Sequence, residues 1–414
     1  MAKGADRLWQ VDALRGLMLV LMTATHLPTR FSAPLGQPFG YVSAAEGFVL
    51  LSGFMAGLVY TKRQQRSGNP EMRSAFFKRV LKIYLCQAAL LLFLFSVITL
   101  IGIATDQAAV TGLLSFYMEK PLAALFGGLL LIYNPPLLDI LPMYILFMLA
   151  SPVLLVHGIH SGWRLILGAS VALWLAAQFG LGHVLYDEAV ALTGLPVPFQ
   201  ETGSFQILAW QILWVTGLWM GSERAAGAPA VSFPRWLVRT AAIVGLTFFI
   251  WRHVIGQSPF PHMPPVELLF DKWQLAPMRL INLFALLVLA MHFAPWLSAR
   301  LPRIRMLETL GAASLPVFCA HLVLALLALA IAGEPNESRS WWIDITVFFG
   351  SMAALCVVAV ISGQIDRQAA KVKASVTAKV QARKATRAAT RMAKLTSRRT
   401  ASQAAAQRLR DARK

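Results

Sequence analysis

Apolar stretches of about 20 residues recur along almost the whole chain, and this feature limits the fold more than any other. A helix of that length crosses the ~30 Å of hydrocarbon in a bilayer. Of the 414 residues, 57% are hydrophobic and only 14% are charged. The ten-residue alternation of a membrane barrel is missing from the pattern. The sequence therefore predicts an all-α polytopic membrane protein, because only helices and closed barrels satisfy their backbone groups in lipid.

The hydropathy pattern predicts about ten transmembrane helices. Their approximate bounds are 11–28, 42–61, 80–103, 138–159, 163–182, 205–221, 236–255, 278–297, 309–332 and 341–364. The apolar segment 121–134 is shorter and runs into two prolines, so we expect a re-entrant or interfacial segment there.

The distribution of Lys and Arg predicts the orientation of these helices. With the N-terminus in the cytoplasm, the basic loops after the second, sixth and eighth helices all face inside, and the outer loops collect acidic residues. Residues 366–414 hold 15 Lys or Arg and two acids, and they also face inside. We therefore expect cytoplasmic termini, a transmembrane domain over 1–365, and a basic tail over 366–414 that is disordered or a surface helix.

The charge and the cysteines exclude some functions. The net charge of +19 comes mainly from the tail and the inner loops, so it is weak evidence for nucleic acid and we expect no such partner. Cys86, Cys319 and Cys356 fit neither a metal motif nor a disulfide framework. We expect no metal and no permanently bound cofactor.

The first predicted helix carries ionisable residues that a membrane helix rarely carries without a function. Asp12, Arg15 and His26 share one helical face, with His26 near the outer end. Arg15 and His26 are 11 positions apart, about 16 Å along a helix, which is close to the reach of a pantetheine arm. Asp12 and Arg15 are therefore candidates for binding acyl-CoA, with the thioester near His26. The alternative is a helix-end Asp–Arg pair and an interfacial histidine.

A carboxylate opens the second predicted helix on the same outer side as His26. Imidazole exchanges protons near neutral pH, so His26 is the candidate general base and Glu46 the candidate partner that orients it. The alternative for Glu46 is stabilisation by the positive end of the helix dipole. There is no Gly-x-Ser-x-Gly elbow, which argues against a serine acyl-enzyme.

Several motifs follow one another along the chain: Asp12-Ala13-Leu14-Arg15-Gly16 with His26-Leu27-Pro28, Ala45-Glu46-Gly47-Phe48, Asp139-Ile140-Leu141-Pro142, Leu208-Ala209-Trp210-Gln211, Asp271-Lys272 with Pro277-Met278-Arg279, and Ser314-Leu315-Pro316 with His321. Together they resemble the OpgC family of membrane succinyltransferases, which act on osmoregulated periplasmic glucans and are related to the acyltransferase-3 superfamily. The resemblance covers about residues 8–330. It implies ten helices, an acyl-CoA donor on the inside and a glycan acceptor on the outside.

Each of the remaining polar candidates has a possible binding role and a structural alternative. Trp210 and Gln211 are candidates for acyl-CoA contact, or they join helices. Asp139, Lys272, Arg279 and His321 are candidates for binding the acceptor or the acyl group. The two cations suit a succinyl carboxylate, although interfacial snorkelling is an alternative. Asp139 is otherwise a helix cap.

The sequence therefore favours a multi-pass O-acyltransferase of the bacterial inner membrane. It would transfer an acyl group, from succinyl-CoA or acetyl-CoA, to hydroxyls of a periplasmic glucan through a pore for the pantetheine arm. The competing functions are a secondary transporter of organic anions and a membrane scaffold whose tail recruits a partner. The acyl group, the glycan and the oligomeric state are left open.

Overall fold

The computed structural model describes residues 8–229, 231–335 and 338–411, and every regular element in these ranges is helical. The chain divides into two compact units, Met1–Ala359 and Val360–Lys414. The predicted all-α class is confirmed.

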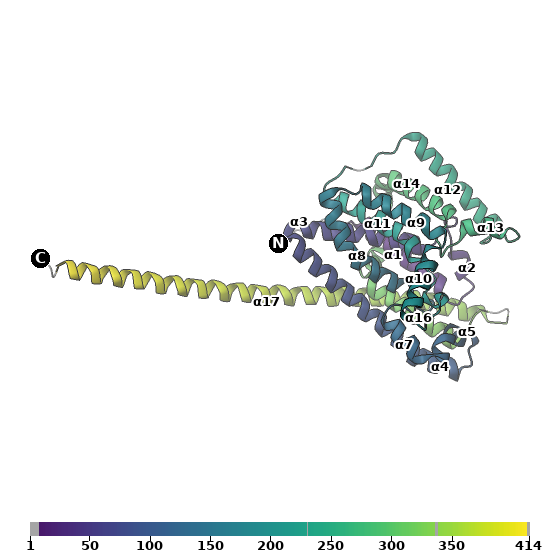
Figure 1. The fold of residues 1–414 in the computed structure, drawn as a ribbon, viewed down its shortest axis with the longest axis horizontal. Helices are drawn as coiled ribbons and strands as arrows, with labels where there is room; N and C mark the ends of the chain where they lie inside the picture. The colour runs from purple at the N-terminus through teal and green to yellow at the C-terminus, as the bar shows by residue number, and fades with distance from the viewer. Residues whose placement is uncertain (1–7, 230, 336–337, 412–414) are drawn as a thin grey trace. The chain divides into compact units, whose positions relative to one another are not determined.

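The first unit is a bundle of long helices joined by short ones (Figure 1). The longer helices of the whole chain are α1 (Trp9–His26), α3 (Ala44–Phe93), α8 (Ile140–Ser161), α9 (Arg164–Gln178), α10 (Leu181–Thr193), α11 (Ile207–Ala225), α12 (Arg235–Ile255), α14 (Pro277–Arg300), α16 (Ser314–Ala332) and α17 (Trp341–Asp411), of which α17 belongs to the second unit from Val360 onward. The short helices are α2 (Ser32–Leu35), α4 (Thr99–Ala104), α5 (Ala108–Leu113), α6 (Ser115–Glu119), α7 (Pro121–Leu129), α13 (Pro264–Glu267) and α15 (Arg305–Ala312), with a π-helix at Leu94–Ile98 and 3₁₀ turns at Phe199–Thr202 and Leu268–Phe270.

Six helices in the described ranges are long and apolar enough to cross a membrane, and a seventh is possible if α9 and α10, bent by 78°, form one span. The protein is therefore a multi-pass membrane protein. The count of ten spans and the sides of the termini stay predictions. The helices α1 and α11 have sufficient length, but polar residues such as Asp12, Arg15 and Gln211 reduce their hydropathy.

The second and third predicted spans form one kinked element. The helix α3 continues through the π-helix into α4, so the basic loop expected over 62–79 is largely helical. The break is at Gly68, where φ is 82° and ψ is 176°, a conformation that glycine adopts far more readily than other residues. Pro70 follows and lacks the N–H that an uninterrupted helix would need.

Glycines bring the central helices into close contact. Gly53 and Gly57 of α3 lie against backbone atoms of α11, and Gly217 and Gly221 of α11 lie against α3. A small residue every fourth position lets two helix backbones approach closely in a membrane. The α3–α11 contact is the most extensive between helices, and it fixes the wall of the bundle to which α8 is added.

The helix α1 is fixed by a second glycine crossing. Gly16 of α1 faces the Leu307 carbonyl of α15, and Gly311 of α15 faces the Asp12 carbonyl of α1. The same helix also packs on α3 and α16. This crossing fixes the position of His26, the last residue of α1, relative to the neighbouring helices.

The apolar segment 121–134, for which a re-entrant or interfacial position stays a prediction, is short. It contains α7, which has nine residues and is too short to cross a bilayer. The second unit is helical through Asp411.

Candidate active site

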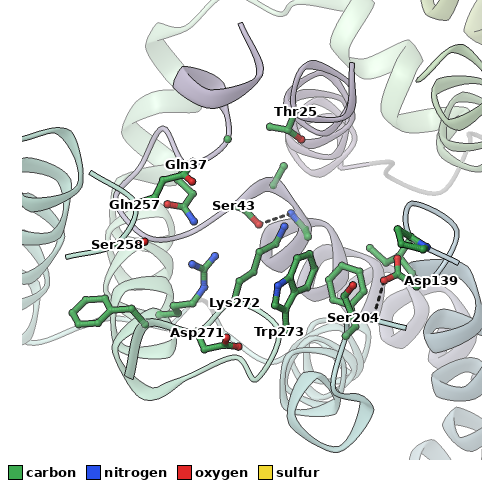
Figure 2. Close-up of a pocket in the computed structure, with 18 of the residues that line it drawn as sticks. Thr25, Gln37, Ser43, Asp139, Ser204, Gln257, Ser258, Asp271, Lys272 and Trp273 are labelled. Atoms are coloured by element: carbon green, nitrogen blue, oxygen red, sulfur yellow. Dashed lines mark hydrogen bonds between the residues drawn. The ribbon is translucent and has the colours of Figure 1, made fainter. Parts of the chain in front are cut away.

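A polar cavity of about 860 Å³ opens where the ends of α1, α3, α8 and α14 meet the loops between them. Figure 2 shows Lys272 and Trp273 side by side in this cavity, with Asp139 and Ser204 to one side and Gln37 and Gln257 to the other. Four of the residues predicted from the sequence line it: His26, Asp139, Lys272 and Arg279. Residues distant in the sequence are therefore assembled at one site.

The cavity wall at the end of α1 carries His26. The helix ends here because Leu27 is extended, as is usual before a proline such as Pro28. The Nδ1 atom of His26 lies 3.1 Å from Nε2 of His321, and the two rings stack with centroids 5.3 Å apart. His321 is fully buried and does not line the cavity, so its predicted role in contacting the acceptor or the acyl group is not supported by its position.

Glu46 has other partners than the one expected. Its carboxylate accepts hydrogen bonds from Nε and Nη2 of Arg279, at 3.1 and 2.7 Å, and from the backbone N–H and hydroxyl of Ser43. Among the described residues no hydrogen bond joins Glu46 to His26. The Ser43 contacts form a capping box, in which the third helical residue reaches back to the N-cap. The expected orientation of His26 by Glu46 is therefore corrected: Glu46 caps α3 and neutralises Arg279.

The loop before α14 supplies a second cation to the cavity. The ammonium of Lys272 lies 4.5 Å from the centroid of the Trp273 ring. Burial lowers the pKa of Lys272, while the nearby Glu46 carboxylate acts in the opposite direction. Because Arg279 is already paired with Glu46, Lys272 is the cation at this cavity without an ion-pair partner among the salt bridges of the described residues.

Asp139 precedes α8 and faces the cavity from the opposite side. Its Oδ2 accepts a hydrogen bond of 3.0 Å from the backbone N–H of Ser204. Burial raises the pKa of Asp139 to about 6, although this hydrogen bond favours the ionised form. Its side chain makes no capping hydrogen bond with α8. The predicted alternative of a helix cap is therefore wrong, and Asp139 is a cavity residue.

Aromatic rings lie beside Arg15, which belongs to the other half of α1. Arg15 donates a hydrogen bond of 2.6 Å to the Ser314 hydroxyl, beside a space of only about 20 Å³. Phe48 and Phe318 line this space and stack on each other, and Phe318 contacts His321 edge-on. A space of this size holds about one water. The space beside Arg15 is therefore too small for a pantetheine arm, and the expected pore stays a prediction.

The residues proposed for donor binding divide into two groups. Asp12 and Arg15 are buried at the α1 end that carries the small space. Trp210 is fully buried and donates to the Trp273 carbonyl, and Gln211 exchanges hydrogen bonds with Ser170 of α9. These hydrogen bonds support the alternative that Trp210 and Gln211 join elements of the bundle, and their contact with acyl-CoA stays a prediction.

Several residues that line the cavity are not among the predicted site residues. Gln37, Ser204, Gln257 and Trp273 lie in loops between helices and line the cavity. For Gln37, Ser204 and Gln257, the sequence offers only a polar residue in a predicted loop. Trp273 has a further indication, because it directly follows the Asp271-Lys272 motif.

A comparison with known protein families assigns the chain to one of them. The family model described as "OpgC protein" matches residues 7–367. The chain belongs to the OpgC family. The match extends beyond the residues 8–330 that carry the motifs, and it includes nearly all of the first unit. OpgC membership indicates a transferase that modifies glucans.

No curated protein and no solved structure matches this OpgC-family chain. The assignment therefore depends on the family match and on the site itself. Within the described residues, no group of three or more His, Cys, Asp or Glu side chains is arranged to hold a metal ion.

Proposed function

We propose that this OpgC-family protein is an O-acyltransferase of the bacterial inner membrane. It transfers a succinyl group from cytosolic succinyl-CoA to hydroxyl groups of a periplasmic glucan, with both of its termini in the cytoplasm. The observation that supports this most is the position of His26. Its imidazole lies on the wall of a polar cavity that also presents Lys272 and Arg279.

The chemistry follows from the two ring nitrogens of His26. Since Nδ1 faces His321, the opposite nitrogen, Nε2, is available to take a proton from an acceptor hydroxyl. The hydroxyl oxygen then forms a bond with the thioester carbonyl carbon, and the bond between that carbon and sulfur breaks. The departing CoA thiolate receives the proton from His26, so the enzyme returns to its starting state.

The cavity suits a sugar acceptor. Its volume of about 860 Å³ lies within the range of sites for small molecules and cofactors. The aromatic side chains of Trp273 and Phe205 line it together with amide and carboxyl groups. Aromatic surfaces of this kind pack against the apolar faces of sugar rings, and the polar groups accept or donate hydrogen bonds to hydroxyls.

The donor reaches the same site from the opposite end of α1. Arg15 is the phosphate-binding candidate there, because guanidinium binds phosphate oxygens through two parallel hydrogen bonds. A pantetheine arm needs more room than the space beside Arg15 provides. Donor binding therefore requires Phe48 and Phe318 to separate.

Purified protein in detergent tests the proposal. With succinyl-CoA and periplasmic glucan, the wild type is expected to release free CoA and to add the mass of a succinyl unit to the glucan. The variant H26A should remain folded and lose transfer. Uptake of organic anions into vesicles without CoA release would instead favour a transporter. Transfer from acetyl-CoA but not from succinyl-CoA, in parallel assays, would overturn the succinyl assignment.

A further inference from the structure

The contact between His26 and His321 carries more information than the position of either residue alone. His321 lies on α16, is fully buried, and directs Nε2 at Nδ1 of His26 over 3.1 Å. The rings are nearly parallel, with 20° between their planes. A distance of 3.1 Å between two nitrogens is that of a hydrogen bond, so one of the two nitrogens carries the hydrogen and the other accepts it.

Only one of the two arrangements leaves His26 with a basic nitrogen at the cavity. If Nδ1 of His26 donates, its Nε2 has a lone pair and can accept the proton of a hydroxyl. If Nε2 of His321 donates instead, the neutral His26 ring carries its hydrogen on Nε2 and cannot act as a base there. Whether His26 can act as a base at the cavity therefore depends on whether His321 accepts the hydrogen of Nδ1.

The surroundings of His321 favour a neutral imidazole. Phe318 contacts its ring edge-on at 4.7 Å between centroids, and Phe318 in turn stacks on Phe48. Lys272, Arg279 and Asp139 line the cavity together with His26, and Arg279 is paired with Glu46. Two imidazoles in contact cannot both be protonated at low cost, because like charges at such a distance repel strongly in a buried site.

We propose that His321 is a positioning residue, a neutral imidazole whose Nε2 accepts the Nδ1 hydrogen of His26 and so holds Nε2 of His26 as the base that faces the acceptor. This role is the one that a carboxylate plays in a serine hydrolase triad. It rests on the proposed acyl transfer, in which His26 deprotonates an acceptor hydroxyl. When His26 takes up that proton, the same hydrogen bond stabilises the imidazolium.

Three variants on α16 test this role in steady-state transfer. H321L removes the acceptor and should lower kcat by about 100-fold, the lower end of what acid–base catalysis contributes. The KM for glucan should stay unchanged, because His321 does not line the cavity. H321Q retains an acceptor oxygen and should recover most of kcat. The control L326A shortens another fully buried side chain of α16, and its kcat should stay near that of the wild type.

A measurement of the tautomer separates this inference from the proposed function. In protein labelled with ¹⁵N-histidine, the His26 signals, assigned by comparison with H26A, should show hydrogen on Nδ1 in the wild type and in H321Q. In H321L the population with hydrogen on Nε2 should increase. Wild-type kcat in folded H321L, or hydrogen on Nε2 of His26 in the wild type, would overturn the role of His321. Failure of the wild type to transfer any acyl group would overturn the proposed function instead.

Discussion

Arg279 binds the Glu46 carboxylate through both Nε and Nη2, at 3.1 and 2.7 Å, and both side chains are almost completely buried. The two residues are 233 positions apart and join α14 to the start of α3. The same carboxylate also receives the backbone N–H of Ser43. One side chain therefore caps a helix and compensates a buried cation at the edge of the cavity.

Removing one partner of this buried pair should destabilise the protein strongly. E46Q leaves the Arg279 charge uncompensated, and we expect a loss of about 3–5 kcal/mol in the free energy of unfolding. The double variant E46Q/R279M should be more stable than the sum of the two single changes predicts. Thermal unfolding of the four proteins in detergent measures this coupling. The control R303A removes an exposed ion pair with Glu308 and should cost at most about 1 kcal/mol.

Lys272 should select the acyl donor. A succinyl group carries a carboxylate that an acetyl group lacks, and a charged hydrogen bond to it stabilises binding by about 1.5–3 kcal/mol. K272M is therefore expected to raise the KM for succinyl-CoA by about 10- to 100-fold. The KM for acetyl-CoA, measured in the same assay, should not change. K120M, at an exposed position away from the cavity, is the matched control. Equal effects of K272M on both donors would contradict this assignment.

The carboxyl of Asp139 should make stability depend on pH. Burial raises its pKa from 3.8 to about 6, so the folded protein holds this proton more tightly than the unfolded chain does. The resulting stabilisation is complete below pH 3.8 and is lost as the pH rises through about 6. Relative to D139N, the wild type should lose about 3 kcal/mol between pH 3.5 and 7.5. Melting curves of both proteins over this range would refute the shift if they stayed parallel.

Substitution of Gln211 should change stability, whereas substitution of Arg15 should change the KM for acyl-CoA. Gln211 exchanges hydrogen bonds with the Ser170 hydroxyl and carbonyl, at 2.7 and 2.8 Å. Q211M should therefore lower stability by about 1–3 kcal/mol and leave the KM for acyl-CoA unchanged. R15M should raise that KM, since Arg15 is the proposed phosphate ligand. An increased KM in Q211M at unchanged stability would return Gln211 to the donor site.

The glycine crossing between α1 and α15 should not tolerate a side chain. A Cβ at Gly311 would collide with the Asp12 carbonyl oxygen, so G311A must separate two helices and should lower the melting temperature clearly. G168A is the matched control, because a Cβ at that helical position meets no atom within 4 Å. Equal melting temperatures of the two variants would show that the crossing can adapt.

Hydropathy alone predicts much of the bundle because it is a local property. The predicted helices 236–255 and 278–297 correspond closely to Arg235–Ile255 and Pro277–Arg300. The expected loop over 62–79 is wrong, because a chain of helix-forming residues continues α3 and bends only at Gly68. Local preference for a helix outweighs hydrophilic composition there.

The sequence by itself determined the helical membrane class and placed charged and polar residues at helix ends, because both depend on residues near one another in the chain. Its motifs also brought His26, Asp139, Lys272 and Arg279 into one candidate set. Only the tertiary structure decided their partners: His26 meets His321 across 295 positions, and Glu46 meets Arg279 instead of His26. Such pairings depend on how helices pack, and hydropathy and helical periodicity contain no information about which distant helix supplies the partner.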